Sequence, residues 1–365
     1  SMYLWDTTGK KYLDFIGGWA VNALGHSPEG LTKALNQQAQ TLWNASPAFY
    51  NKPMIAFANT LVSNSCFDHV FFGSSGAEAN ESAIKLARKY GQKHKEGAFE
   101  IITTLNSFHG RTLATMAATG KEKWQTLFSP KVEGFKHVPF NDIDAIKQTL
   151  SKNTLAIMLE PIQGEGGVNV ADTSYIQGLR TLCDKENILL IFDEVQTGIG
   201  RTGKLFCYEH YNIKPDIMTL GKNIGSGFPL SAMLTHKKFN LFEPGDQGGT
   251  YTGQPLAMTV GLNVLETVNA PDFLNNINER STQIKDAFKK LSENFPIQNI
   301  RGKGLLLAFD LPNENAQNLA KHCLEEGLII NAPSPKTVRV IPPLIVGKKH
   351  ISEMIRILKK ALTQL

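Results

Sequence analysis

The sequence predicts an α/β protein whose main sheet is mostly parallel and is covered by helices on both faces. Short apolar runs alternate with amphipathic helical patterns through the middle of the 365-residue chain, and this alternation is typical of β-α-β units. Beyond about residue 270, helices and extended segments are segregated, which favours a second, smaller α+β domain. A chain of this length also exceeds the usual single hydrophobic core, so two domains are expected.

The strands and helices follow in order along the chain. Five apolar runs are predicted as strands of the main sheet: residues 70–72, 100–105, 154–159, 187–192 and 216–220. Helical spacing of apolar residues predicts helices at 78–90, 174–186, 256–269, 273–295, 315–326 and 351–365, with extended segments at 305–310 and 337–341. We expect residues 40–270 to form the large domain, and residues 1–39 and 271–365 to form the small α+β domain.

The composition excludes several classes of protein. Hydrophobic residues make up 42% and charged residues 19% of the chain, which is ordinary for a globular protein and excludes a disordered or collagen-like one. The net charge is +5, but Lys and Arg alternate with Asp and Glu, so no nucleic-acid partner is expected. No apolar stretch reaches the ~18 residues of a membrane span, and the start lacks the apolar core of a signal peptide.

Cysteine and histidine usage favours a cytoplasmic protein without a metal site. Four cysteines lie far apart and form no C-x-x-C pair: Cys66, Cys183, Cys207 and Cys323. The nine histidines form no H-E-x-x-H or similar pair of metal ligands. We therefore expect reduced thiols, a cytoplasmic location and no bound metal ion.

Polar or glycine-rich clusters follow four of the predicted strands, where open α/β sheets build their sites. The first cluster is Gly73-Ser74-Ser75-Gly76-Ala77, directly before the 78–90 helix. Backbone N–H groups and the helix dipole at such a loop favour an anion, and phosphate is the usual one. A simple helix cap by Ser75 accounts for the loop equally well.

The second cluster, Asp193-Glu194-Val195-Gln196, follows the strand at 187–192. A carboxylate at the end of a buried strand is costly to keep charged unless something cationic faces it. A pyridinium nitrogen is such a partner, and an Asp or Arg at that nitrogen recurs in pyridoxal phosphate sites. The alternative is that Asp193 only caps a turn or a helix.

The third cluster contains Lys222 in the run Gly221-Lys222-Asn223-Ile224-Gly225-Ser226-Gly227, beyond the strand at 216–220. A lysine framed by glycines can approach a cofactor closely and lose its proton more easily than a surface lysine, as Schiff-base chemistry requires. A lone loop lysine is more often solvated, but the glycines and the Asp193 cluster favour the chemical interpretation.

The fourth cluster is Phe108-His109-Gly110-Arg111, after the strand at 100–105. An aromatic side chain there can stack on a planar ring, and Arg111 can bind a carboxylate through two hydrogen bonds. The alternative is that Phe108 is a core residue and Arg111 a surface residue.

One further motif, Gly198-Ile199-Gly200-Arg201-Thr202-Gly203, matches the G-x-G-x-x-G dinucleotide fingerprint. Five residues separate it from the preceding strand, no helical pattern begins at Gly203, and no acidic residue closes a following strand about 20 positions on. A dinucleotide site is therefore not expected here. The chain also has no G-x-x-x-x-G-K-[ST] motif, so phosphoryl transfer is unsupported.

In this order, the clusters resemble the class III pyridoxal-phosphate aminotransferases, and most closely the acetylornithine aminotransferase family. The resemblance covers nearly the whole chain and its motifs are specific as an ordered set. They are Asp14-Phe15-Ile16-Gly17-Gly18-Trp19-Ala20-Val21-Asn22-Ala23-Leu24-Gly25-His26, Ser75-Gly76-Ala77-Glu78-Ala79-Asn80, Phe108-His109-Gly110-Arg111-Thr112, Glu160-Pro161-Ile162-Gln163-Gly164-Glu165, Asp193-Glu194-Val195-Gln196-Thr197-Gly198, the Lys222 run and Arg339-Val340-Ile341-Pro342-Pro343-Leu344.

The resemblance implies the type I fold of pyridoxal-phosphate-dependent transferases, with a seven-stranded α/β domain, and a homodimer with shared active sites. It implies that Lys222 carries the cofactor covalently and then moves a proton, while Asp193 keeps the pyridine nitrogen protonated. Gln196 would bond the phenolic oxygen of the ring, and Phe108 would cover a ring face. The phosphate would be held by Ser75, Gly76 and Ala77; Ala77 stands where many members of the family have Thr.

The same resemblance assigns the substrate residues. Thr250 would reach the phosphate of the partner subunit, and Gly249 would lie beside the substrate. Arg111 would bind the substrate carboxylate. Glu165 and Arg339 would form a switchable pair that is closed for the ω-amino donor and open for the second carboxylate of 2-oxoglutarate.

The implied activity is transfer of the ω-amino group of N-acetylornithine, or a close analogue, to 2-oxoglutarate in arginine biosynthesis. Other donors remain open: ornithine, succinylornithine, 4-aminobutyrate or an acyl-diaminopimelate intermediate. A mutase or racemase on the same scaffold is a further alternative. A mutase or racemase should not need the Glu165–Arg339 pair, and a non-enzymatic binding protein would be expected to lose Lys222 or Asp193.

Overall fold

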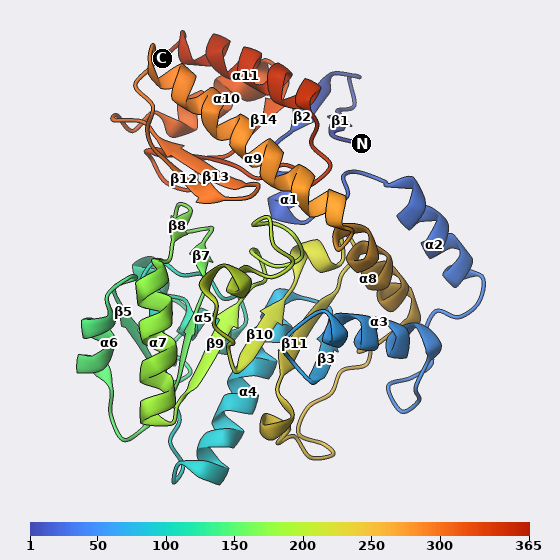
Figure 1. Ribbon diagram of the computed structural model, residues 1–365, viewed down its shortest axis with the longest axis vertical. Coiled ribbons are helices and arrows are strands. Elements are labelled where there is room, and N and C mark those ends of the chain that lie inside the picture. The colour runs from blue at the N-terminus through green and yellow to red at the C-terminus, as the bar shows by residue number, and fades with distance from the viewer.

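The computed structural model describes all 365 residues, and its largest element is a seven-stranded sheet (Figure 1). The strands lie in the order β3-β11-β10-β9-β6-β4-β5. β11 is antiparallel to β3 and β10, and every other neighbouring pair is parallel. The bounds are β3 (His69–Gly73), β4 (Glu100–Thr104), β5 (Phe135–Val138), β6 (Thr154–Leu159), β9 (Leu189–Asp193), β10 (Ile217–Leu220) and β11 (Ser231–Thr235). The predicted α/β fold with a mostly parallel sheet is confirmed.

Five of these strands match strands predicted from the sequence, whereas β5 and β11 are not predicted. β5 is Phe-Lys-His-Val and β11 begins with Ser-Ala, so neither stands out as an apolar run. β11 is nevertheless buried at every position because it lies between β3 and β10. Its strand conformation depends on pairing with segments far away in the chain, which local composition does not report.

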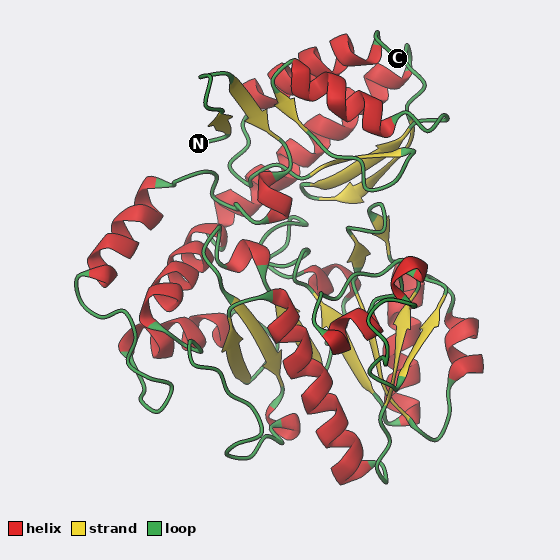
Figure 2. Ribbon diagram, turned by 180° about the vertical axis from the view of Figure 1, so that it is seen from behind, coloured by secondary structure: helices red, strands yellow, loops and turns green.

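Helices cover both faces of the sheet. In β4, Ile101 belongs to a buried cluster with α4 (Gly76–His94), whereas Ile102 belongs to a cluster with α7 (Thr173–Glu186). Successive side chains of a strand point to opposite faces, so α4 and α7 lie on opposite sides of the sheet. Figure 2 shows the same sheet between its helical layers from behind.

The C-terminal part of the chain forms a second unit, which lies above the large sheet in Figure 1. Its antiparallel sheet has the order β12-β13-β15, and α9, α10 and α11 pack beside it. The N-terminal strands join this unit because β2 pairs with β14 in parallel. The bounds are α9 (Pro271–Ser292), β12 (Gln298–Lys303), β13 (Leu306–Asp310), α10 (Ala316–Glu325), β14 (Leu328–Ile329), β15 (Thr337–Val340), α11 (Lys348–Leu362), β1 (Tyr3–Trp5) and β2 (Lys11–Asp14).

Six further helices and several shorter elements complete the chain. α2 and α3 both pack against α8, beside the β3 edge of the large sheet.

None of the helices combines the length and apolar character needed to cross a membrane. The remaining bounds are α1 (Gly17–Ala20), α2 (Glu29–Ala39), α3 (Lys52–Ser63), α5 (Leu113–Ala118), α6 (Ile143–Thr149), β7 (Ile162–Gln163), β8 (Asn169–Val170) and α8 (Pro255–Val268), with 3₁₀ turns at Glu122–Trp124, Cys207–Tyr211, Lys222–Ile224 and Lys237–Phe239.

Candidate active site

A cavity of about 260 Å³ lies at the carboxyl ends of the central strands, beside the N-terminus of α4. The structure brings seven of the predicted site residues into its wall: Gly76, Ala77, Phe108, Arg111, Asp193, Gln196 and Lys222. The other lining residues are Asn80, His109, Gly110, Glu160 and Val195. Segments from five different parts of the chain therefore meet at one edge of the sheet, as parallel strands require.

Asp193 is the last residue of β9 and is buried. Its Oδ2 lies 2.8 Å from Nδ1 of His109 and accepts a hydrogen bond from Nδ2 of Asn80 at 2.8 Å. Its Oδ1 accepts the backbone N–H of Val195 at 3.0 Å. For His109 to donate to the carboxylate, its proton must sit on Nδ1. The donors hold the charged carboxylate in one orientation at the cavity wall.

Asn80 and His109 line the cavity and bond Asp193, although no role is predicted for them from the sequence. Asn80 Nδ2 also donates to the carbonyl of His109 at 2.7 Å, and Asn80 Oδ1 accepts from the hydroxyl of Thr219 at 2.7 Å. The network thus joins α4, the loop after β4 and strands β9 and β10. Both residues stand in the motifs that carry the family resemblance, which was the available signal.

Lys222 begins a 3₁₀ turn directly after β10 and Gly221. Its φ of 46° lies in the left-handed region, which is strained for a residue with a side chain and is maintained only by a surrounding structure that fixes it. Burial lowers the pKa of Lys222, against the opposing charges of Glu165, Asp193 and Glu160. The Lys222 amine makes no ion pair, so it loses its proton more readily than an exposed lysine.

Glycine is required where the Lys222 loop meets the start of α4. A Cβ on Gly76 would lie 2.7 Å from Cγ1 of Val195, and a Cβ on Gly221 would lie 3.3 Å from the Cα of Gly76. Only glycine lets these backbones approach so closely. Gly76 and Ala77 are the first residues of α4, so their N–H groups have no acceptor within the helix and are available for an anion.

Ser75 caps α4, which is the alternative that sequence analysis left open. Its hydroxyl accepts from the backbone N–H of Glu78 at 3.3 Å, while Oε2 of Glu78 accepts the N–H groups of Ser74 and Ser75 at 2.7 Å. This reciprocal capping box stabilises the helix start. The side chain of Ser75 is not part of the cavity wall.

Aromatic and charged side chains form the outer wall. The ring of Phe108 meets Trp124 edge to face, with centroids 5.6 Å apart, and the guanidinium of Arg111 lies 5.1 Å from the Trp124 ring. Arg111 is exposed and lines the cavity mouth. Trp124 was missed by sequence analysis because it lies in a polar segment with no strand nearby. Its stacking on Arg111 restricts where that side chain can reach.

Glu160 is a second buried carboxyl group in the wall. Its Oε1 accepts the backbone N–H of Phe108 at 2.8 Å. Burial, with a further contribution from Asp193, raises the pKa of Glu160 well above its usual value, against the opposing effect of His109. Glu160 is thus more readily neutral than an exposed glutamate.

Glu165 and Arg339 form an ion pair of 2.8 Å between Oε1 and Nη1. Arg339 lies on β15, is fully buried, and also donates to the Gly164 carbonyl at 2.7 Å and to Oδ1 of Asn331 at 3.1 Å. Although burial opposes it, the charge of Arg339 lowers the pKa of Glu165 below its usual value. Nη2 of Arg339 has no partner, so this guanidinium retains a free donor.

The Glu165–Arg339 pair is connected to the cavity through Gly164. A Cβ on Gly164 would overlap Oε1 of Gln196, which lines the cavity, so the backbone beside Glu165 presses directly on that amide. Gly249 and Thr250 lie elsewhere: both are exposed and neither belongs to the wall.

The wall matches the chemistry of pyridoxal phosphate. Both polar atoms of the Gln196 amide are buried without a hydrogen-bond partner, so the wall offers a ligand both a donor and an acceptor. Asp193 supplies a fixed negative charge, and the N–H groups of Gly76 and Ala77 supply an anion site at a helix N-terminus. These three features fit a protonated ring nitrogen, a phenolic oxygen and a phosphate.

Known proteins are similar to this chain in sequence and in fold. The sequence model of the family Aminotransferase class-III matches residues 1–362. The acetylornithine aminotransferase of Ralstonia nicotianae is 52% identical, over 99% of this chain and 92% of that protein.

Two solved structures superpose on the whole chain. The ornithine aminotransferase of Toxoplasma gondii has a TM-score of 0.95 at 30% identity, covering 100% of this chain and 89% of its own. The N-acetylornithine aminotransferase of Stenotrophomonas maltophilia has a TM-score of 0.87 at 33% identity, covering 100% and 94%. The protein therefore belongs to the class III aminotransferases, enzymes that depend on pyridoxal phosphate.

Proposed function

We propose that the enzyme transfers the ω-amino group of N-acetylornithine to 2-oxoglutarate, giving a semialdehyde and glutamate, as a step of arginine biosynthesis. The observation that carries this proposal is the single cavity that combines Lys222, Asp193 and the unpartnered Gln196 amide, next to the Glu165–Arg339 pair. The relative from Ralstonia nicotianae supports the choice of donor.

The proposed cofactor residues follow from the wall. Pyridoxal phosphate supplies an electron sink for the negative charge that develops when a proton leaves the substrate carbon. Lys222 would hold the cofactor covalently and carry the proton on Nζ. Asp193 would face the ring nitrogen, Gln196 the phenolic oxygen and Phe108 a ring face. The phosphate would be bound by the N–H groups of Gly76 and Ala77, with Ser75 fixing the loop as a helix cap.

The proposed substrate residues explain how one cavity can accept two substrates that carry different charges. Arg111, at the cavity mouth, would bind the carboxylate that both substrates share. The amino donor needs no second cation, whereas 2-oxoglutarate has a second carboxylate. Arg339 would bind that carboxylate when Glu165 releases it, and Glu165 would neutralise Arg339 while the donor reacts.

Separate half-reactions test this pair. We expect Arg339→Lys to weaken 2-oxoglutarate binding by about 2 kcal/mol, because an ammonium group cannot make the paired hydrogen bonds of a guanidinium to a carboxylate, and to spare the donor half-reaction. Glu165→Ala should let α-amino acids such as glutamate compete better as donors, because Arg339 is then always free. Stopped-flow absorbance of the cofactor measures each half. Equal damage to both halves in both variants would show that the pair is only structural.

A panel of donors tests the function as a whole. We expect N-acetylornithine to convert the cofactor fastest, ahead of ornithine, succinylornithine, 4-aminobutyrate and an acyl-diaminopimelate. Faster conversion by ornithine would instead favour the activity named for the Toxoplasma gondii structure. Racemisation or an amino shift within one substrate, without 2-oxoglutarate, would favour the mutase or racemase alternative.

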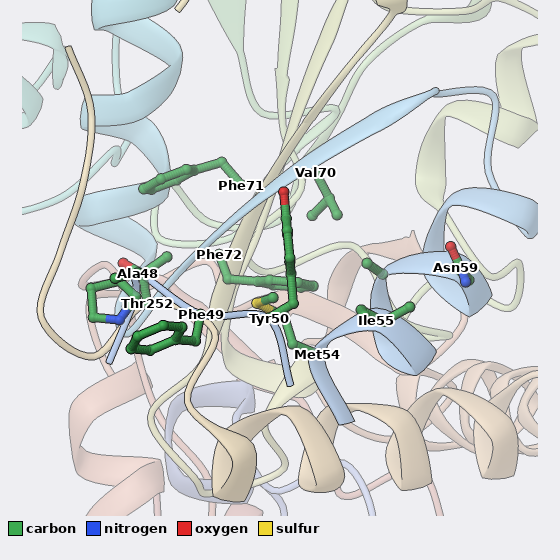
Figure 3. Close-up of a pocket in the computed structure, with 12 residues that line it drawn as sticks. Ala48, Phe49, Tyr50, Met54, Ile55, Asn59, Val70, Phe71, Phe72 and Thr252 are labelled. Carbon is green, nitrogen blue, oxygen red and sulfur yellow. The ribbon is translucent and has the colours of Figure 1, made fainter. Parts of the chain in front are cut away.

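We also propose that the enzyme is a homodimer in which Gly249 and Thr250 serve the partner's site. Both residues are exposed and lie outside their own cavity. Beside them is an apolar pocket of about 470 Å³ between α3, the β3 edge and Thr252, with Phe49 68% and Tyr50 86% exposed (Figure 3). An exposed apolar surface of this kind is typical of a protein interface.

Disruption of this surface should weaken the site. We expect Tyr50→Glu to shift the sedimentation coefficient to that of a monomer and to lower cofactor affinity and activity together, because Thr250 then no longer reaches the partner's site. Trp5→Glu is the matched control, since Trp5 is 60% exposed on β1 in the other unit. A monomeric Tyr50→Glu enzyme that kept tight cofactor and full rate would contradict the shared site.

We propose that residues 40–270 form the cofactor domain and that residues 1–39 with 271–365 form the small domain. The pairing of β2 with β14 supports the joining of both termini. The packing of α2 against α8 favours the cofactor domain for that segment instead. All four cysteines are free thiols, in keeping with a cytoplasmic location, which we also propose.

A further inference from the structure

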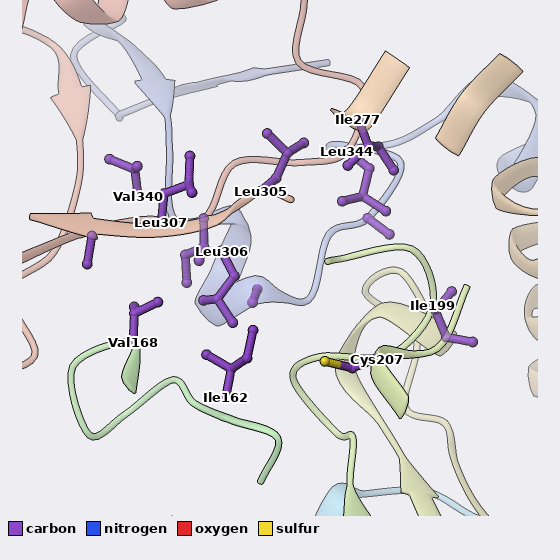
Figure 4. Close-up of a cluster of buried hydrophobic side chains, with 14 of the residues drawn as sticks. Ile162, Val168, Ile199, Cys207, Ile277, Leu305, Leu306, Leu307, Val340 and Leu344 are labelled. Carbon is purple, nitrogen blue, oxygen red and sulfur yellow. The ribbon is translucent and has the colours of Figure 1, made fainter. Parts of the chain in front are cut away.

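The Gly198–Gly203 motif, set aside as a nucleotide site, lies at the contact between the two units. No helix begins at Gly203. Figure 4 shows Ile199 and Cys207 below the C-terminal unit, which contributes Leu305, Leu344 and Ile277 to the same apolar cluster.

Two close approaches explain the glycines at this contact. The N–H of Leu305 donates to the Arg201 carbonyl at 2.9 Å, and a Cβ on Gly304 would lie 2.5 Å from that same oxygen. Gly203 has a φ of +86°, and its carbonyl accepts from Nδ2 of Asn278 on α9 at 3.0 Å. The motif is thus the surface on which the C-terminal unit rests.

Arg201 is the charged residue of this contact, and it is fully buried without a carboxylate partner. Its Nη1 donates to the carbonyls of Leu305 at 3.1 Å and Pro342 at 2.5 Å, and its Nη2 donates to Oδ1 of Asn223 at 3.2 Å. Burial lowers the pKa of Arg201 to about 9. Burial of a guanidinium costs free energy unless acceptors surround it. The three acceptors of Arg201 belong to three separate segments, which indicates that Arg201 holds these segments in position.

Two acceptors of Arg201 lie near Lys222, which would serve the reacting carbon, and near Arg339, which would bind the second carboxylate of 2-oxoglutarate. Asn223 directly follows Lys222, and Pro342 lies three positions after Arg339 on the segment that continues β15. Asn223 also donates from Nδ2 to the carbonyls of Gly198 and Ile199, both at 3.4 Å. The guanidinium of Arg201 therefore links the Lys222 turn to the segment that follows Arg339.

We propose that Arg201 is a positioning residue that fixes the distance between Lys222 and Arg339 by tying the Lys222 turn to the C-terminal unit. This inference rests on the proposed function, in which Arg339 binds the second carboxylate of 2-oxoglutarate. The donor half-reaction does not use Arg339 as a ligand. Loss of the link therefore slows the 2-oxoglutarate half-reaction and largely spares the donor half-reaction, because misplacement of a binding group costs most where both ends must be aligned.

The test compares Arg201→Met and Asn223→Ala with Asn278→Ala, which removes a bond to the same loop without touching the Lys222 turn. In holoenzyme, we expect the first two variants to slow the 2-oxoglutarate half-reaction by about 10-fold to 10²-fold relative to the donor half-reaction. Asn278→Ala should leave that ratio unchanged. If Arg201→Met does not fold, Asn223→Ala carries the test. In that variant Arg201 can still donate to the carbonyls of Leu305 and Pro342.

Amide hydrogen exchange gives a second readout that does not depend on turnover. We expect faster exchange at both residues 221–226 and residues 339–346 in Arg201→Met and Asn223→Ala, and at neither segment in Asn278→Ala. Equal slowing of both half-reactions, or faster exchange at only one of the two segments, would overturn the positioning role. Wild-type enzyme that performs neither half-reaction would refute the proposed function instead, while the exchange result would still decide whether Arg201 links the two segments.

Discussion

Lys222→Ala should lose turnover by on the order of 10⁴-fold or more, because one side chain supplies both the covalent attachment and the proton carrier. The variant should still bind pyridoxal phosphate, since the Asp193 carboxylate, the Gln196 amide and the N–H groups of Gly76 and Ala77 remain. Fluorescence titration measures the binding, and single-turnover absorbance measures the chemistry. The two results separate loss of the reactive amine from loss of the site.

Borohydride reduction of the wild-type enzyme identifies the attached lysine. We expect mass spectrometry to find the reduced cofactor on Lys222, which is the lysine in the cavity wall and whose pKa is lowered by burial. Lys121 is the matched control, because its Nζ lies 5.2 Å from the Phe108 ring and so is close to the same cavity. Label on Lys121, or undiminished turnover in Lys222→Ala, would refute the assignment.

The sequence predicted the parts of the fold that local pattern controls. The strand 154–159 is an uninterrupted apolar run and was located at its observed bounds, since a central parallel strand is buried on both faces. β11 was missed because its burial comes from its two neighbours and not from its own composition. Pairing between distant segments is the information that a single sequence does not display.

The same distinction applies to the candidate site: some of its residues could be predicted from local sequence, and others could not. Lys222 and Asp193 could be singled out because each follows a strand in an unusual local setting. The partners of Asp193 could not be deduced, because Asn80 and His109 lie on a helix and a loop that only the sheet topology brings to β9. A cation is predicted opposite Asp193, and within the protein Asn80 and His109 hold one of its oxygens.

Those donors make Asp193→Asn the sharpest test of the electrostatics. An asparagine has one oxygen and one NH₂ group, while the site around Asp193 offers donors to both carboxylate oxygens. Either orientation of the amide therefore sets an N–H against another N–H, and the negative charge is lost. We expect the chemical step to slow by on the order of 10² or more, as for other preorganised electrostatic partners.

A control separates charge from position. Thr219→Val removes the hydroxyl that orients Asn80 at 2.7 Å but keeps the Asp193 charge, so only a small loss of rate is expected. Single-turnover rates and the pH dependence of the cofactor spectrum, which is sensitive to the charge facing the ring, should both change in Asp193→Asn and not in Thr219→Val. A near-normal single-turnover rate in Asp193→Asn would make this carboxylate a structural cap of β9, since its donors would then serve packing alone.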